Sequence, residues 1–153
     1  MKTKTVMFFY ILCLAVVIIF GSCATKQIAI SHEEAVEAFS GTWTNPDYDE
    51  TWRYSKVIIN SDGTWIEYKM CNDDRPILIG EYNITEKWID TDGYIFYKII
   101  VTRTDREYVP YYLIARIDKT GNVYEDLWTT AHMPTEFDPD NVLYNYRIYY
   151  RQE

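Results

Sequence analysis

The sequence predicts an all-β protein, an eight-stranded antiparallel up-and-down barrel with a short helix at its start. After residue 38, aromatic and aliphatic residues alternate with polar ones in successive segments. Tight-turn signals separate most of these segments, and no stretch between them suits a long crossover helix. A β-sandwich is the alternative, but its Greek-key connections need longer excursions than most of these turns provide.

Composition and charge narrow the classes of protein and partner. The chain has 153 residues, of which 48% are hydrophobic, 17% aromatic and 25% charged, as expected for one packed domain plus a targeting segment. The formal net charge is -8. An acidic surface repels phosphate backbones and anionic headgroups, so we expect neither nucleic-acid binding nor unassisted docking on anionic lipid.

The first residues have the pattern of a secretory signal. Lys2 and Lys4 precede an apolar stretch over residues 6–20, which is too short for a membrane-spanning helix. Gly21-Ser22-Cys23 follows and resembles the processing site of a bacterial lipoprotein, where cleavage exposes the cysteine for attachment of palmitate-type acyl chains. A simple secretory signal with an incidental cysteine is the alternative.

This resemblance divides the chain into three parts. They are a signal peptide (1–22), a lipidated cysteine with a tether and a short helix (23–38), and a barrel domain (39–153). The expected location is the bacterial cell envelope, with the N-terminal lipid in a membrane; the outer membrane is favoured over the inner. Cys71 is then the one thiol left without lipid, so no intrachain disulfide is expected.

The start of the barrel domain is marked by a helix and a Gly-x-Trp pattern. Ser31 and Glu34 have the spacing of a capping box and predict a helix of about two turns ahead of Phe39. Gly41 and Trp43 then open the first strand. The glycine allows another segment to approach closely, and the indole is expected to plug the floor of the barrel.

The remaining strands follow in order along the chain. Asp62-Gly63 and Asp92-Gly93 predict tight hairpin turns, and Gly80 within a strand predicts a bend or bulge. In the segment 64–71, we expect Ile66, Tyr68 and Met70 to form the apolar face. The seven expected strands after the first are 54–60, 64–71, 77–88, 94–103, 108–118, 122–129 and 143–151.

Taken together, residues 31–151 resemble the lipocalin superfamily, in particular the lipocalin-like domains of bacterial lipoproteins. The residues that carry the resemblance are Gly41 and Trp43 at the first of eight strands, after a short helix. The Thr-Asp-Tyr turn of classical lipocalins is absent, so the resemblance is to an outlier of the superfamily. It implies an arginine from the last strand stacked on Trp43, and we expect Arg151 rather than Arg147 in this place.

Five tyrosines are the candidate lining of a ligand site inside the barrel. Strand alternation would point each inward, where a hydroxyl suits an amphipathic or aromatic ligand. The alternative is that they fill the barrel, because an eight-stranded barrel has little interior space. The candidates are Tyr68, Tyr82, Tyr97, Tyr111 and Tyr146.

The sequence offers little support for catalysis or metal binding. No nucleophile, phosphate-loop or paired metal motif is present. His132 with Asp138 and Asp140, in the longest connection, matches no ligand spacing, and we read that connection as a lid or loop over a rim. Glu125 or Asp126 is a possible inward acid. We expect neither a cofactor nor an enzyme.

Two functions from different classes remain open. The first is a membrane-anchored lipocalin-like lipoprotein that binds or carries a small apolar or amphipathic molecule. The second is a filled barrel that serves as an interaction or structural module, with tryptophan and tyrosine side chains as contacts. The expected contact residues of the second are Trp52, Trp65, Trp88 and Tyr112. An internal cavity larger than roughly 300 Å³ would favour the first function.

Overall fold

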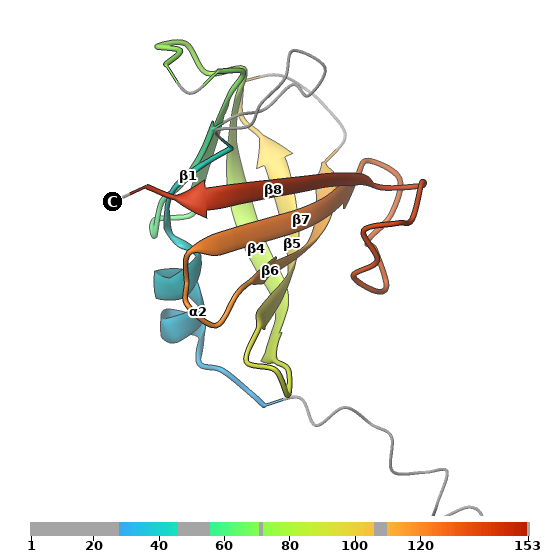
Figure 1. Ribbon diagram of the computed structural model, residues 1–153. Helices are drawn as coiled ribbons and strands as arrows, with labels where there is room; N and C mark the ends of the chain where they lie inside the picture. The colour runs from blue at the N-terminus through green and yellow to red at the C-terminus, as the bar shows by residue number, and fades with distance from the viewer. Residues whose placement is uncertain (1–27, 46–55, 71, 106–109, 153) are drawn as a thin grey trace, which may run out of the picture.

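Eight strands close into one antiparallel barrel in the computed structural model, which describes residues 28–45, 56–70, 72–105 and 110–152. Each strand pairs with its neighbours in the sequence, and β8 returns to pair with β1 (Figure 1). This is the predicted up-and-down barrel. The strands are β1 (Gly41–Thr44), β2 (Lys56–Ile59), β3 (Thr64–Tyr68), β4 (Leu78–Ile89), β5 (Ile95–Arg103), β6 (Tyr111–Ile117), β7 (Val123–Thr129) and β8 (Asn145–Arg151).

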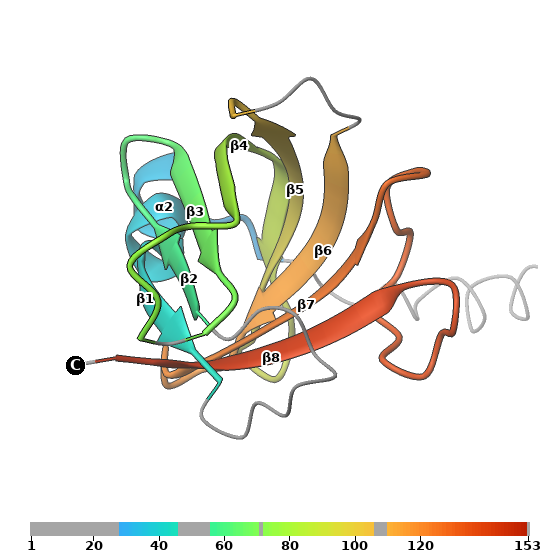
Figure 2. The same cartoon turned by 90° about the horizontal axis from the view of Figure 1, so that it is seen from above.

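Helix α2 (His32–Phe39) packs against one end of the barrel and has the predicted cap. The Ser31 hydroxyl accepts a hydrogen bond from the backbone N–H of Glu34, and the Glu34 carboxylate accepts one from the backbone N–H of Ser31. Phe39 is fully buried, with its ring 4.8 Å from that of Tyr97 and 5.7 Å from that of Tyr124. We call this the closed end and the opposite end the mouth. Figure 2 shows the same barrel from above.

Two predicted turns form as expected, whereas the predicted irregularity lies elsewhere. Gly63 and Gly93 have φ values of 95° and 87°, the conformation that their Asp-Gly turns require. The register shift in β4 falls between Ile84 and Glu86, and Gly80 pairs regularly with Arg103. Of the predicted bend or bulge at Gly80, the bulge is therefore wrong, whereas the bend remains a prediction. A Cβ atom at Gly80 would lie 2.7 Å from the carbonyl oxygen of Thr102, which explains the glycine by close backbone approach.

Arg151 locks the closed end, as the resemblance implies. Its guanidinium carbon lies 4.3 Å from the centre of the Trp43 ring. The same guanidinium donates hydrogen bonds to the carbonyl oxygens of Ala38, Ser40 and Gly121, at 2.6, 3.0 and 2.8 Å. The last strand is therefore fastened to both the helix and the first strand.

The connection from β7 to β8 packs on the outside of the barrel. The ring of Phe137 lies 6.0 Å from that of Phe96 and 6.5 Å from that of Tyr146, both on the outer face. Its position agrees with the burial of Ile114 and Leu127, whose strands place them on that face. The prediction that this segment covers a rim is wrong for Phe137.

We expect Gly41→Ala to lower the free energy of unfolding by about 3 kcal/mol. Gly41 has φ of 152°, and an added Cβ would lie 2.8 Å from Nη1 of Arg151, whose guanidinium is held by three carbonyls and an indole. Urea unfolding measures the loss. The matched control is Gly121→Ala, which has positive φ and open space around its Cβ and should cost about 1–2 kcal/mol. An equal or smaller loss for Gly41→Ala would contradict the proposed lock.

Candidate functional site

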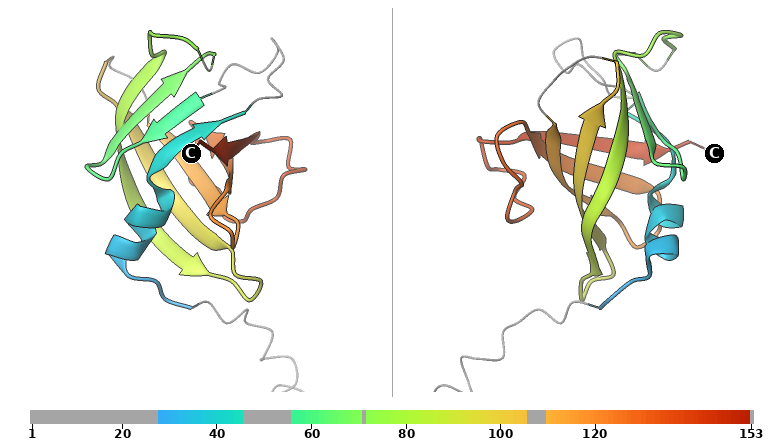
Figure 3. Two further views of the ribbon diagram at one scale, coloured as in Figure 1. Left: turned by 60° about the vertical axis from the view of Figure 1, so that its left-hand side comes forward. Right: turned by 180° about the vertical axis from the view of Figure 1, so that it is seen from behind.

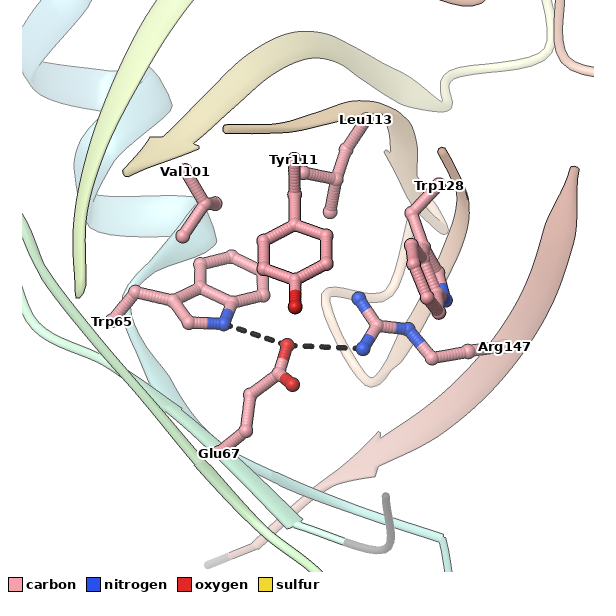
Figure 4. A pocket seen from close by; sticks show the side chains of 7 residues that line it. All are labelled: Trp65, Glu67, Val101, Tyr111, Leu113, Trp128 and Arg147. Carbon is pink, nitrogen blue, oxygen red and sulfur yellow. Dashed lines mark hydrogen bonds and ion pairs between the residues drawn. The ribbon is translucent and has the colours of Figure 1, made fainter. Parts of the chain in front are cut away.

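The candidate site is a small cavity between the barrel interior and the mouth (Figure 4). Its volume is about 10 Å³, close to the least room that one water molecule needs. An aromatic wall surrounds a charged floor, and the strands that supply them lie around the ring. The lining residues are Trp65, Glu67, Val101, Tyr111, Leu113, Trp128 and Arg147.

Arg147 is the centre of the charged floor. Its Nε and Nη2 atoms donate to the two carboxylate oxygens of Asp126, at 2.7 and 2.9 Å, in a bidentate pair. Its Nη1 atom donates to Oε1 of Glu67 at 3.0 Å. The Trp65 indole N–H donates to the same Glu67 oxygen at 2.8 Å, and the Tyr124 hydroxyl donates to Asp126 at 2.6 Å.

Strand alternation places these residues inside. Trp65 and Glu67 lie opposite Ile59 and Val57 of β2, which are buried core residues. Asp126 and Arg147 are direct cross-strand partners on β7 and β8, so register alone brings them together. Glu67 lies 80 positions from Arg147 in the sequence and reaches it because the barrel closes.

Burial and charge act on the floor in opposite directions. Asp126 is fully buried and Glu67 is 4% exposed. Burial raises the pKa of the Asp126 carboxyl, and this effect outweighs the opposing charge of Arg147. For Arg147, burial alone would lower the pKa, but the negative charge of Asp126 and its other polar neighbours raise it well above its usual range. The guanidinium therefore stays charged.

The fully buried Tyr124 also belongs to this network. Burial and the nearby Asp126 charge raise the pKa of its hydroxyl well above the usual range, so it remains a neutral hydrogen-bond donor. Because Arg147 binds both Asp126 and Glu67, these charged groups of the floor are hydrogen-bonded to one another. The floor is therefore held together by hydrogen bonds and ion pairs within the protein.

Three of the five predicted lining tyrosines lie inside the barrel. Tyr97 is fully buried and donates to the carbonyl oxygen of Ala35 at 3.1 Å, and Tyr82 donates to that of Asn60 at 2.9 Å. Tyr111 lines the cavity at the mouth. Ligand binding by these residues remains a prediction, and two of the hydroxyls already have partners within the protein.

The inward orientation predicted for Tyr68 and Tyr146 was wrong. Tyr68 lies opposite Lys56 across the β2–β3 pair, and the Lys56 ammonium sits 4.0 Å from the centre of its ring, on the outer face. Tyr146 precedes the inward Arg147 and therefore points outward, where its hydroxyl donates to Glu125. The expected apolar face of β3 is accordingly the outer one.

The other expected residues are also placed by the structure. Trp65, expected as an exposed contact, is fully buried because its indole completes the charged floor. Trp88 and Tyr112 are half-buried on the outer face. Of the two candidate acids, Asp126 points inward, whereas Glu125 points outward and binds Arg116 at 2.6 Å.

Several expectations fall outside the described residues. They concern the signal peptide, lipidation at Cys23, Cys71 and Trp52. In the described ranges, no group of three or more histidine, cysteine, aspartate or glutamate side chains is arranged to hold a metal ion; this applies to His132, Asp138 and Asp140 as well. The helices of the same ranges include none long and apolar enough to cross a membrane.

Glu67 and Arg147 are the site residues that the sequence analysis missed. The available signal was alternation, since Arg147 shares a face with Tyr149 and Arg151, and Glu67 shares one with Trp65. Comparisons of the chain with protein-family models, curated proteins and solved structures gave no match.

We expect Arg147→Met to lower the free energy of unfolding by about 3–5 kcal/mol at pH 7, because it leaves two buried carboxylates without their cation. The loss should shrink towards pH 4. Without the guanidinium, burial raises the pKa of Asp126 further above its unfolded value. The folded state then binds more protons than the unfolded chain, so stability falls as the pH rises through this window.

Urea unfolding at pH 4, 5.5 and 7 measures this loss. The matched control is Arg116→Met, which breaks a partly exposed pair with Glu125 on the outer face and should cost about 1 kcal/mol or less. A loss for Arg147→Met that equals the control, or that does not depend on pH, would show that the floor is not held by charge.

Proposed function

We propose that this protein is a lipid-anchored, lipocalin-like lipoprotein of a bacterial envelope whose filled barrel serves as an interaction or structural module. The observation that carries the proposal is the small size of the cavity at the mouth. The cavity at the mouth measures about 10 Å³, whereas pockets for small organic ligands measure about 300–1,000 Å³. Carriage inside the barrel would require large side chains to leave their places.

The energetics of the interior favour the same function. Trp43, Trp65, Tyr97 and Tyr124 are fully buried, and the guanidinium of Arg147 occupies the polar centre. Displacing Arg147 to admit an apolar ligand would separate it from two buried carboxylates, which costs several kcal/mol. An apolar ligand supplies no group that replaces these hydrogen bonds.

The anchor and the family are proposed from the sequence. The support for the anchor is the charged and apolar leader followed by Gly21-Ser22-Cys23. Support for the lipocalin-like family comes from the closed eight-stranded barrel, the helix at its end and the stacking of Arg151 on Trp43. A fold of this kind hosts many functions, so the filled interior and the surface must distinguish among them.

The candidate contact surface is the end of the β7–β8 connection. Val142 and Leu143 are adjacent large apolar residues that are 95% and 72% exposed. They lie just before β8, on a segment that Phe137 fastens to the outer face. An exposed apolar pair on a fastened loop is suited to contact with a protein partner.

Native mass spectrometry with lipid extraction tests the filled barrel, using a soluble version that begins at Ala24. We expect a bare protein mass and no binding of a hydrophobic probe, because the cavity at the mouth holds about one water molecule. A reproducible co-purifying small molecule would contradict this and establish the carrier function. In that case Tyr111→Ala, at the cavity wall, should reduce its occupancy, whereas Tyr68→Ala, on the outer face, should not.

Site-specific photo-crosslinking in intact cells tests the contact surface. A photoreactive residue at position 143 should give a discrete adduct with a protein, because Leu143 is exposed and apolar. The matched control is position 81, where the exposed Glu81 lies on the outer face of β4. No adduct at position 143, or the same adducts at both positions, would contradict a partner on the β7–β8 connection.

A further inference from the structure

The chain enters the barrel domain at the closed end. Ile28 and Ile89 form an antiparallel bridge, with a hydrogen bond from each backbone N–H to the other carbonyl oxygen at 3.0 Å. Ile89 is the last residue of β4, next to the β4–β5 hairpin turn. Both views in Figure 3 place residues 28–30 beside this hairpin, at the same end as helix α2.

The direction of the chain at this bridge decides which end of β4 is nearer to the N-terminal segment. β4 runs from the mouth to the hairpin, and Ile28 is antiparallel to it. The chain at Ile28 therefore runs from the hairpin turn towards the mouth, so it enters the bridge from the side of that turn. The mouth end of β4 lies far from this point, because its 12 residues span about 37 Å at the usual rise.

The proposed lipid attachment is close to Ile28 in the sequence. Cys23 precedes Ile28 by five positions, and five residues reach at most about 18 Å when fully extended. A lipid on Cys23 thus keeps the closed end within about 18 Å of the membrane surface, which is half the length of β4.

We call the part of the closed end around the β4–β5 hairpin, residues 88–96, the hairpin side. It has aromatic residues that suit a membrane interface. Trp88 and Phe96 are stacked on the outer face with their ring centres 5.2 Å apart, and Tyr94 lies 6.5 Å from Phe96. All three are half-buried: Phe137 packs on Phe96 and the Arg116 guanidinium lies over Tyr94, and each residue keeps part of its surface exposed. Tryptophan and tyrosine favour the headgroup region because they combine an apolar ring with a polar group.

Charge distinguishes the hairpin side from the helix side. Beside the hairpin, Lys119 and Arg116 lie among the acids Asp90, Asp92 and Asp118. A Cβ at Gly93 would lie 3.4 Å from that of Lys119, and the Arg116 guanidinium carbon lies 4.9 Å from the centre of the Tyr94 ring. This side therefore presents charges of both signs, although the whole chain has a net charge of -8. Helix α2 instead exposes three acids, Glu33, Glu34 and Glu37, which an anionic surface repels.

From these observations we propose that the anchored barrel stands on the membrane by the hairpin side of its closed end. Trp88, Tyr94 and Phe96 then face the lipid headgroups, together with Phe137, which packs on Phe96. The mouth and the exposed pair Val142 and Leu143, at the β8 end of the β7–β8 connection, point away from the bilayer. This orientation rests on the proposed anchor at Cys23. The lipid supplies the attachment, and the aromatic residues supply only the orientation, in keeping with the acidic surface of the chain.

Fluorescence quenching in vesicles tests the orientation. The full-length lipoprotein is purified from membranes and reconstituted in phosphatidylethanolamine–phosphatidylglycerol vesicles that contain a headgroup nitroxide lipid. With Cys71→Ser, a fluorophore is attached to Thr91→Cys at the hairpin turn or to Leu143→Cys near the mouth. We expect the nitroxide to quench the label at position 91 at least threefold more than the label at position 143. Equal quenching, or stronger quenching at position 143, would overturn the orientation.

A pair of variants tests the aromatic contact. Trp88→Ser should reduce quenching at position 91 at least twofold, because it removes one face of the stacked pair. Tyr112→Ser changes another half-buried outer aromatic, on β6 opposite Ile100, and should leave quenching unchanged. Equal effects of the two substitutions would show that the stacked aromatics do not orient the barrel.

The intact mass of the same purified protein separates failure of the orientation from failure of the anchor. A diacylated Cys23 has no free thiol, so labelling is confined to the introduced cysteine. A mass without lipid, together with a second labelled site at Cys23, would overturn the anchor and the orientation with it. A lipidated protein with equal quenching at both positions would overturn the orientation and leave the anchor in place.

Discussion

The arrangement of the barrel interior depends on one cation, the guanidinium of Arg147. Two of its nitrogens bind Asp126 and the third binds Glu67, so a single side chain joins β8 to β7 and, across the barrel, to β3. Buried ion pairs contribute little net stability, because desolvation offsets their attraction. Their effect is on specificity: a shift of register at β7–β8 would separate Asp126 from Arg147 and leave charges buried alone.

Arg147 also explains how the barrel closes with short pairing between β8 and β1. Only Trp43 with Arg151 and Thr44 with Tyr150 are in register at this seam within the described residues. Two arginines on the inner face of β8 add contacts that this short pairing lacks, and each of them binds different groups. Arg151 binds backbone carbonyls at the closed end, and Arg147 binds carboxylates nearer the mouth. Side chains thus supply the order that a longer ladder of backbone hydrogen bonds supplies at β4–β5.

Local signals were sufficient to predict the fold. The capping box at Ser31, the Asp-Gly turns and the alternation along each strand depend on residues close in sequence. The faces of β3 and β8 were harder, because their more apolar side chains, such as Ile66 and Tyr146, point outward. An inward Glu67 is favourable only with a cation beside it, and that cation lies 80 positions away. Alternation along a strand shows which residues share a face, but not which face is inside. In β3 the ion pair of Glu67 with the distant Arg147 accounts for the inward face.

Because the cavity at the mouth is small, the outer surface of the barrel is the better candidate for a functional contact. A hollow barrel presents its ligand at the mouth, whereas here the mouth leads to a charged floor that is satisfied within the protein. The two ends of the barrel then differ in what they offer. The closed end receives the chain through the Ile28–Ile89 bridge, and the β7–β8 connection exposes Val142 and Leu143. A barrel held by its closed end would keep that apolar pair accessible to a partner, which is the property expected of an anchored interaction module.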